Sequence, residues 1–120
     1  MVNQQTATML VPRSGWTLED KSELLLKLYK KAMLCMDDAL ELIERGEMVE
    51  KGKCLIHAQD IVMQLADALD YQGEGYEVAD NLNRLYIYVY RLLTRGNTRL
   101  DSEAICEARD LMARLLTAWE

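Results

Sequence analysis

The sequence predicts an all-α protein, an antiparallel up-down four-helix bundle with a short flexible N-terminal arm. In four segments, apolar residues recur at alternating spacings of three and four, which places them on one helix face. No segment shows the period-two alternation of a strand. Connections of about three to six residues between helices of about 20 residues make neighbours antiparallel. We expect an arm at 1–15 and a bundle at 16–120, with helices at about 17–45, 48–71, 75–95 and 101–119.

The first expected helix follows a polar, aperiodic segment that contains Pro12 and Gly15. Thr17 is its candidate N-cap, and the acidic residues that follow interact favourably with the partial positive charge at the N-terminus of a helix. Gly46 is the expected C-terminal stop. The main apolar stripe of this helix consists of Leu25, Leu28, Ala32, Cys35, Ala39 and Leu42.

The other three helices show the same apolar spacing. Their stripes are Leu55, Ala58, Val62, Leu65 and Leu69 in the second, Val78, Leu82, Leu85, Val89 and Leu92 in the third, and Ile105, Ala108, Met112, Leu115 and Trp119 in the fourth. The expected boundaries are Gly73 and Gly75 after the second helix, Gly96 and Asn97 after the third, and Asp101 or Ser102 as the cap of the fourth.

The charge balance and the distribution of apolar residues argue against nucleic acid and membranes as partners. The chain has 14 Lys and Arg against 20 Asp and Glu, a net charge of −6, whereas nucleic-acid binding requires clustered basic residues. The N-terminus lacks the basic start and apolar run of a signal peptide, and no stretch approaches the roughly 20 apolar residues of a membrane span. We therefore expect a cytoplasmic protein with no nucleic-acid partner and no membrane insertion.

The sequence offers little for catalysis or metal binding. The only histidine, His57, lies three residues after Cys54 rather than after the glutamate of a di-iron motif. Cys54, His57 and Asp60 share a helix face but lack a fourth ligand. We expect Cys35, Cys54 and Cys106 to be reduced core residues. The prediction is no catalytic residue, no metal and no cofactor, with an enzyme or phosphotransfer module based on His57 as the weakest alternative.

The third helix points instead to protein binding. Tyr86, Ile87, Tyr88, Val89 and Tyr90 are consecutive, so on a helix they project in every direction. One bundle interior cannot accommodate all five, and exposed apolar surface of this kind usually marks a binding site. We expect Tyr86 and Ile87 in particular to be exposed.

Several short motifs occur in a fixed order. They are Ser-Glu-Leu-Leu-Leu-Lys-Leu-Tyr at 22–29, Glu77-Val78-Ala79, Asn81-Leu82, Leu85-Tyr86 followed by Tyr88, Asn97 followed by Asp101, and a final Ala118-Trp119. With these motifs, the segment from Ser22 to Trp119 resembles the flagellar export chaperone family known as FliS. The resemblance covers most of the chain.

The resemblance implies a cytoplasmic four-helix bundle that binds the disordered C-terminal segment of flagellin. Such a chaperone blocks premature polymerisation and delivers flagellin to the flagellar export gate, which would be a second partner. We expect a monomer or weak homodimer, and the alternative is a homodimeric helical adaptor without chaperone activity. The candidate client-binding residues, for most of which burial in the core is the alternative, are Ile61, Leu65, Leu82, Leu85, Tyr86, Ile87, Val89, Met112 and Leu115.

Overall fold

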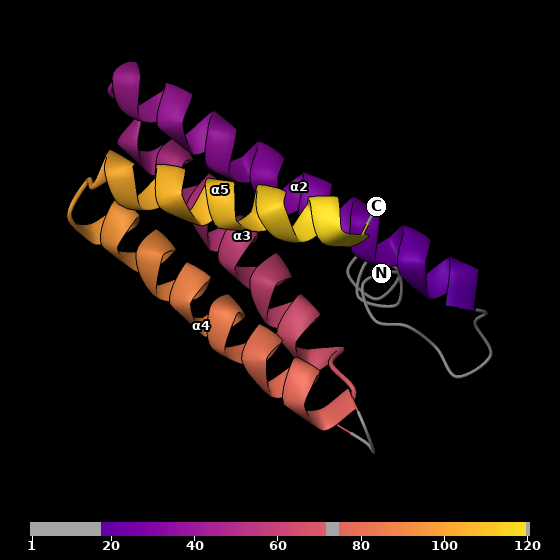
Figure 1. Cartoon of the computed structure of the whole chain (residues 1–120). Helices are drawn as coiled ribbons and strands as arrows, with labels where there is room; N and C mark the ends of the chain where they lie inside the picture. Colours follow the sequence, from indigo (N-terminus) through magenta and orange to yellow (C-terminus); the bar gives the residue numbers. More distant parts are fainter. Residues whose placement is uncertain (1–17, 72–74, 120) are drawn as a thin grey trace, which may run out of the picture.

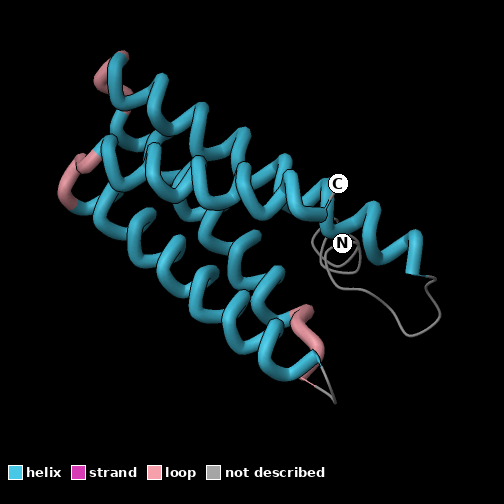
Figure 2. Tube along the Cα trace, in the orientation of Figure 1, coloured by secondary structure: helices cyan, strands magenta, loops and turns pink. Residues whose placement is uncertain are grey.

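Four antiparallel α-helices make up the part of the chain that the computed structural model describes, residues 18–71 and 75–119 (Figure 1). They are α2 (Leu18–Glu44), α3 (Met48–Asp67), α4 (Tyr76–Thr98) and α5 (Ser102–Trp119). These described residues contain no strand (Figure 2). The predicted all-α four-helix bundle is confirmed, whereas the expected arm at 1–15 and the Thr17 cap lie outside the described residues.

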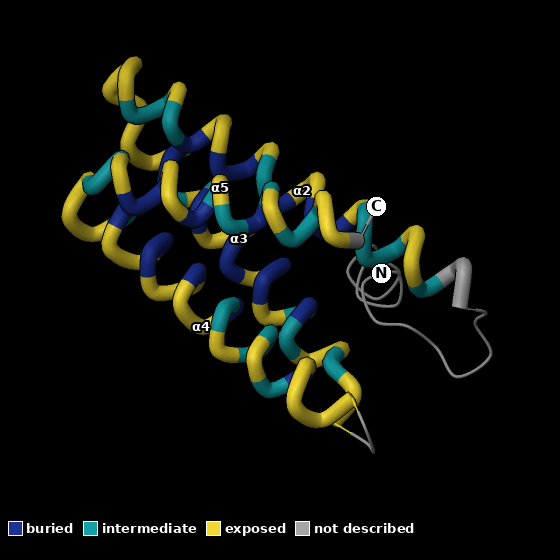
Figure 3. The backbone as a smooth tube through the Cα atoms, in the orientation of Figure 1, coloured by how far each residue is buried: buried dark blue, intermediate teal, exposed yellow. Residues whose placement is uncertain are grey.

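Each helix packs against two neighbours, in the order α2, α3, α4, α5 and back to α2. The buried residues lie along the inner sides of the helices (Figure 3). This pattern follows from the apolar stripes, since burying them against one another is the main stabilising contribution to a bundle. The largest fully buried side chains include Tyr29, Met36, Leu55, Ile61, Leu65, Tyr86, Leu92, Leu93, Ile105 and Met112.

Gly46 ends α2 as predicted. Its φ of 75° is in the left-handed region that glycine adopts without a steric penalty. The Gly46 amide donates to the Ile43 carbonyl at 3.0 Å, and the Glu47 amide donates to the Leu42 carbonyl at 2.9 Å. These two bonds form a Schellman motif, which satisfies carbonyls that the end of the helix leaves free.

Gly96 does not end α4, contrary to the sequence prediction. The helix continues to Thr98, and Gly96 is buried within it. A Cβ atom at this position would lie 2.3 Å from Ile105 Cγ1, so the absence of a side chain allows α4 and α5 to approach closely. The chain turns instead at Leu100, whose φ is 51°. Asp101 then caps α5 as expected, because its Oδ1 accepts a hydrogen bond from the Ala104 amide at 3.2 Å.

The second helix ends earlier than the expected residue 71. The Ala68 amide still donates to the Gln64 carbonyl, but the Leu69 amide donates to the Ala66 carbonyl, only three residues back. Such a bond tightens the last turn and takes the following residues out of helical geometry. The α3 helix therefore stops at Asp67.

Small buried residues gather at one end of the bundle, where α2 and α4 finish and α5 begins. They are Cys35, Ala39, Gly96, Ala104 and Ala108. Helix axes approach more closely where the contacting side chains are small. Toward the opposite end, the α2/α5 pair and the α3/α4 pair diverge (Figure 1).

The diverging end is lined by leucines that are only partly buried. We call this region the leucine end; it comprises Leu24, Leu25, Leu69, Leu82, Leu115 and Leu116. All six pack against the core while keeping part of their surface open to solvent. The described structure thus has a closed end built from small side chains and an end where apolar surface is incompletely covered.

Two polar contacts inside the bundle fix how the helices pair. The hydroxyls of Tyr29 on α2 and Tyr86 on α4 are hydrogen-bonded to each other, with the ring centroids 6.4 Å apart. Near the closed end, the Lys51 ammonium on α3 donates to the Asn97 carbonyl at 3.0 Å and to Asn97 Oδ1 at 2.7 Å. Buried polar groups that are satisfied in this way favour one packing arrangement over its alternatives.

Candidate protein-binding surface

Five of the nine candidate residues lie in the core. They are Ile61, Leu65, Tyr86, Val89 and Met112, each at most 2% exposed. The expectation that Tyr86 is exposed is wrong, because its ring faces inward and its hydroxyl pairs with Tyr29. A partner docked on this closed bundle would not contact these five side chains.

The remaining four candidates reach the surface to different degrees. Leu82 and Leu115 belong to the leucine end, and Leu85 is half-buried. Ile87 is 39% exposed, as expected. The third-helix tyrosines next to it, Tyr88 and Tyr90, are exposed as well, so the run of consecutive apolar residues does place apolar surface outside the core.

A contact between α3 and α4 locates the surface on which Ile87 lies. Gln59 on α3 is buried, and its Nε2 donates to the Tyr90 carbonyl at 3.1 Å and to Thr94 Oγ1 at 2.8 Å. Ile56 and Met63 lie three residues before and four residues after Gln59, on the same face of α3. Ile87 lies three residues before Tyr90 on α4, so these side chains flank the seam between the two helices.

We call Ile56, Met63, Ile87 and Tyr90 the outer α3/α4 surface. Their exposed fractions are 54%, 41%, 39% and 38%. These four large apolar side chains lie along one seam, and exposed apolar side chains that gather in this way are a candidate binding site. Its shape, two parallel apolar rows on packed helices, suits an amphipathic helix laid lengthwise.

Ile56 and Met63 were not among the nine candidate client-binding residues. Both lie outside the apolar stripe of the second helix, whereas the prediction chose candidates on or next to that stripe. A signal was present, because Val49, Ile56 and Met63 recur every seven residues on the opposite face, and all three are exposed. An apolar residue at every second turn of an outward face indicates a partner rather than a core.

Tyr88 connects α4 to α5 on the other side of Ile87. Its hydroxyl donates to the Glu107 carboxylate. This hydrogen bond raises the pKa of Tyr88, with smaller contributions from desolvation and from the negative charge of Glu107. Tyr88 is therefore held against α5, whereas Tyr90 remains with the outer α3/α4 surface.

The three cysteines occupy different environments. Cys35 is buried, Cys54 is half-buried and Cys106 is exposed, so the expectation that all are core residues is wrong for Cys106. Burial is the main cause that raises the pKa of the Cys35 and Cys54 thiols. His57 Nδ1 lies 3.7 Å from Cys35 Sγ. Among the described residues, no group of three His, Cys, Asp or Glu side chains is arranged to hold a metal ion.

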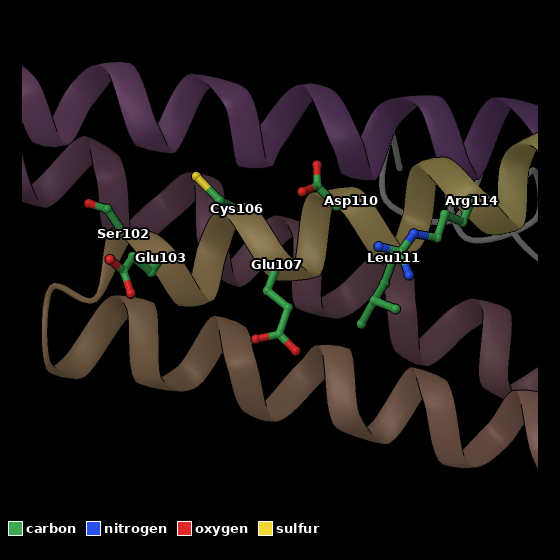
Figure 4. Close-up of a pocket in the computed structure, with 7 residues that line it drawn as sticks. All are labelled: Ser102, Glu103, Cys106, Glu107, Asp110, Leu111 and Arg114. Carbon is green, nitrogen blue, oxygen red and sulfur yellow. The ribbon is translucent and has the colours of Figure 1, made fainter.

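A pocket of about 430 Å³ lies along the outward face of α5 (Figure 4). Five of its seven lining residues have polar or charged side chains; the seven are Ser102, Glu103, Cys106, Glu107, Asp110, Leu111 and Arg114. Glu107 points toward α4, where it meets Tyr88, and Asp110 points toward α2. With Leu111 as its only large apolar side chain, this pocket suits an apolar segment less well than the outer α3/α4 surface does.

The family model described as "Flagellar protein FliS" matches residues 5–120. The chain belongs to the FliS family. It is 35% identical to the flagellar secretion chaperone FliS of Salmonella typhimurium over 99 residues, 82% of this chain and 73% of that relative. It is 29% identical to FliS of Bacillus subtilis over 98 residues, 82% of this chain and 71% of the relative.

A further relative is the flagellar secretion chaperone FliSB of Pseudomonas aeruginosa, 35% identical over 78 residues, 65% of this chain and 61% of that protein. Membership of the FliS family makes this chain a flagellar export chaperone and not an enzyme. A chaperone of secretion has a secretion substrate as its partner. Within the described residues, no helix is both long enough and apolar enough to span a membrane.

Proposed function

We propose that this FliS protein binds the disordered C-terminal segment of flagellin in the cytoplasm, prevents its premature polymerisation and assists its export. The outer α3/α4 surface is the observation that carries the proposal. Ile56, Met63, Ile87 and Tyr90 present apolar rows on two packed helices, a surface that suits the apolar face of an amphipathic helix. In this account the client folds as it docks.

The size of the surface sets how much of the client must be held. Four partly exposed side chains offer at most a few hundred Å², since a fully buried aromatic residue contributes only about 150–250 Å². Coupled folding and binding usually buries about 1,000–3,000 Å² because ordering the chain costs several kcal/mol. The outer α3/α4 surface alone is too small, and the client must reach a second apolar region.

The leucine end is that second region in our proposal. It lies where α4 begins and α3 has just ended, so it adjoins one end of the outer α3/α4 surface. Leu82 and Leu115 belong to it, and the half-buried Leu85 lies one turn further along α4. A client segment that follows α3 and α4 lengthwise covers about 30–35 Å as a helix of 20 to 23 residues before it reaches the leucine end.

Titration calorimetry tests the proposal. The probe is a peptide that covers roughly the last 40 residues of flagellin from the same organism, enough for about two helices of average length with a connection. We expect sub-micromolar affinity, a negative heat-capacity change and a gain of helix in circular dichroism. A folded chain that does not bind at tens of micromolar, which corresponds to a binding free energy weaker than about −6 to −7 kcal/mol, would refute the proposal.

A matched pair of variants tests whether the peptide binds at the outer α3/α4 surface. Ile87→Asp adds a charge in the middle of the outer α3/α4 surface, and it should weaken binding at least about tenfold, or 1.4 kcal/mol. Leu34→Asp makes the same kind of change at a leucine that is 52% exposed on α2, and it should leave binding unchanged. If the peptide does not bind and light scattering shows a tight dimer, the homodimeric adaptor becomes the better account.

A further inference from the structure

Three arginines form a row on α4 beside the outer α3/α4 surface. Arg84, Arg91 and Arg95 are spaced by seven and four residues, which places them on one face of the helix. All three are exposed. Ile87 lies between this row and α3, so the row forms the α4 rim of the apolar surface.

The row is locally basic, whereas the whole chain has a net charge of −6. Arg84 Nε lies 3.2 Å from Asp80 Oδ2 in an ion pair whose arginine side chain is 77% exposed. Arg91 and Arg95 form no ion pair within 4 Å among the described residues. Asp80 thus compensates part of the charge of Arg84. Arg95 acts electrostatically on Tyr88, which is hydrogen-bonded to Glu107. Arg91 and Arg95, which have no ion-pair partner in the described part of the chain, carry most of the positive charge that the α4 rim presents.

The α3 rim carries the opposite charge. Asp60 and Asp67 are exposed on the outward face of α3, and they make no ion pair with described residues. Lys53, on the same face, is paired with Glu50 at 3.4 Å. The outer α3/α4 surface is thus apolar along its seam, basic along one edge and acidic along the other.

We propose that the client segment held on this surface is an amphipathic helix with acidic residues along one flank of its apolar stripe, and that this flank lies against Arg84, Arg91 and Arg95. The inference rests on the proposed function and specifies the chemistry of its client. At 1.5 Å per residue, the arginines lie about 10.5 and 6 Å apart along the α4 axis. A client helix packed alongside matches them with acidic residues spaced by about seven and four positions.

The effect falls mainly on orientation and on the association rate. Each exposed ion pair contributes little affinity, but complementary rims accelerate docking and disfavour the reversed orientation. Reversing the client helix on the seam would turn its acidic flank toward the aspartates of α3. The client is therefore expected to lie in only one direction, with the acidic flank against α4. Raising the salt concentration should slow association by screening the rim charges.

The test compares two double variants with the same change in net charge. Arg91→Glu with Arg95→Glu reverses the rim, whereas Lys27→Glu with Lys30→Glu reverses two exposed lysines on α2. With the flagellin C-terminal peptide as probe, the arginine variant should associate about tenfold more slowly at low salt and lose most of its salt dependence. The lysine variant should change association less than about threefold.

A charge-swap peptide makes the test specific. Replacing the peptide's acidic residues by lysine should weaken its binding to the native chain and restore its binding to the arginine variant. Equal effects of the two double variants would overturn the inference, since net charge alone would then explain them. The inference would also be overturned if the arginine variant associates at the native rate while Ile87→Asp still weakens binding. In that case the proposed function would stand. If neither Ile87→Asp nor the arginine variant affects binding, the outer α3/α4 surface is refuted as the binding site, both for the proposed function and for this inference.

Discussion

Replacing Gly96 with alanine would place a methyl group inside the packed contact between α4 and α5. The new Cβ atom would lie 2.3 Å from Ile105 Cγ1, 2.9 Å from Ile105 Cδ1 and 3.4 Å from the Asp101 carbonyl oxygen. Ile105 is fully buried, so its side chain cannot move outward into solvent to make room. The contact can be relieved only if α5 shifts away from α4 or Ile105 leaves its preferred rotamer.

Gly52 provides a matched control on α3. A Cβ atom there meets only Asn97 Oδ1, at 3.7 Å, which is ordinary van der Waals contact. Both glycines lie inside helices, where alanine is favoured by about 1 kcal/mol. Overpacking costs about 1–3 kcal/mol. Gly52→Ala should therefore raise the free energy of unfolding by about 1 kcal/mol, and Gly96→Ala should lower it by up to about 2 kcal/mol.

Urea denaturation followed by far-UV circular dichroism measures both variants. The difference between them, about 1–3 kcal/mol, isolates overpacking because the helix-propensity contribution is common to both. Combining Gly96→Ala with Ile105→Ala should cost less than the sum of the single changes, since the added methyl fills part of the space that isoleucine leaves. A Gly96→Ala variant as stable as Gly52→Ala would refute the close approach of α4 and α5.

Three further predictions concern buried polar groups and thiols. Lys51→Met should lower the free energy of unfolding by about 1.5–3 kcal/mol in urea denaturation, because it removes two charge-assisted hydrogen bonds to Asn97. Burial, and next its hydrogen bond to a second tyrosine, raise the pKa of Tyr86 above the usual value near 10. Its stabilising contribution is complete below that value and is lost as the pH rises, so in a spectrophotometric titration Tyr86 should ionise only together with alkaline unfolding, a step that Tyr86→Phe removes. In the native state, Cys106 should react with a thiol reagent much faster than Cys35, whose burial protects it and raises its pKa; equal rates would contradict the assigned burial.

The sequence predicted the helices well because helix formation depends on local periodicity and on breakers. Gly46 was assigned correctly, since a glycine just after the last apolar repeat usually supplies a left-handed residue. Gly96 looked the same in sequence, but its role is set by Ile105, which comes from another helix. A glycine in the sequence does not reveal whether it serves a turn or a close packing contact.

The candidate site was harder to predict, because apolar periodicity does not separate core from binding surface. Tyr86 and Tyr90 lie one turn apart on α4, yet Tyr86 is buried and Tyr90 is exposed. The difference depends on Tyr29, whose hydroxyl is hydrogen-bonded to that of Tyr86 across the bundle, and on Gln59, whose amide donates to the Tyr90 carbonyl at the α3/α4 contact. Those pairings are tertiary contacts that no single helix encodes.

The most direct test of the central claim is photo-crosslinking from the outer α3/α4 surface. A photoreactive phenylalanine analogue replaces Ile87 in one protein and, as the control, Leu34 in another, and each is mixed with full-length flagellin before irradiation and mass spectrometry. The account predicts that position 87 crosslinks to the C-terminal segment of flagellin and that position 34 does not. Crosslinks from position 87 only to a second copy of this chain, or equal flagellin crosslinks from both positions, would contradict it.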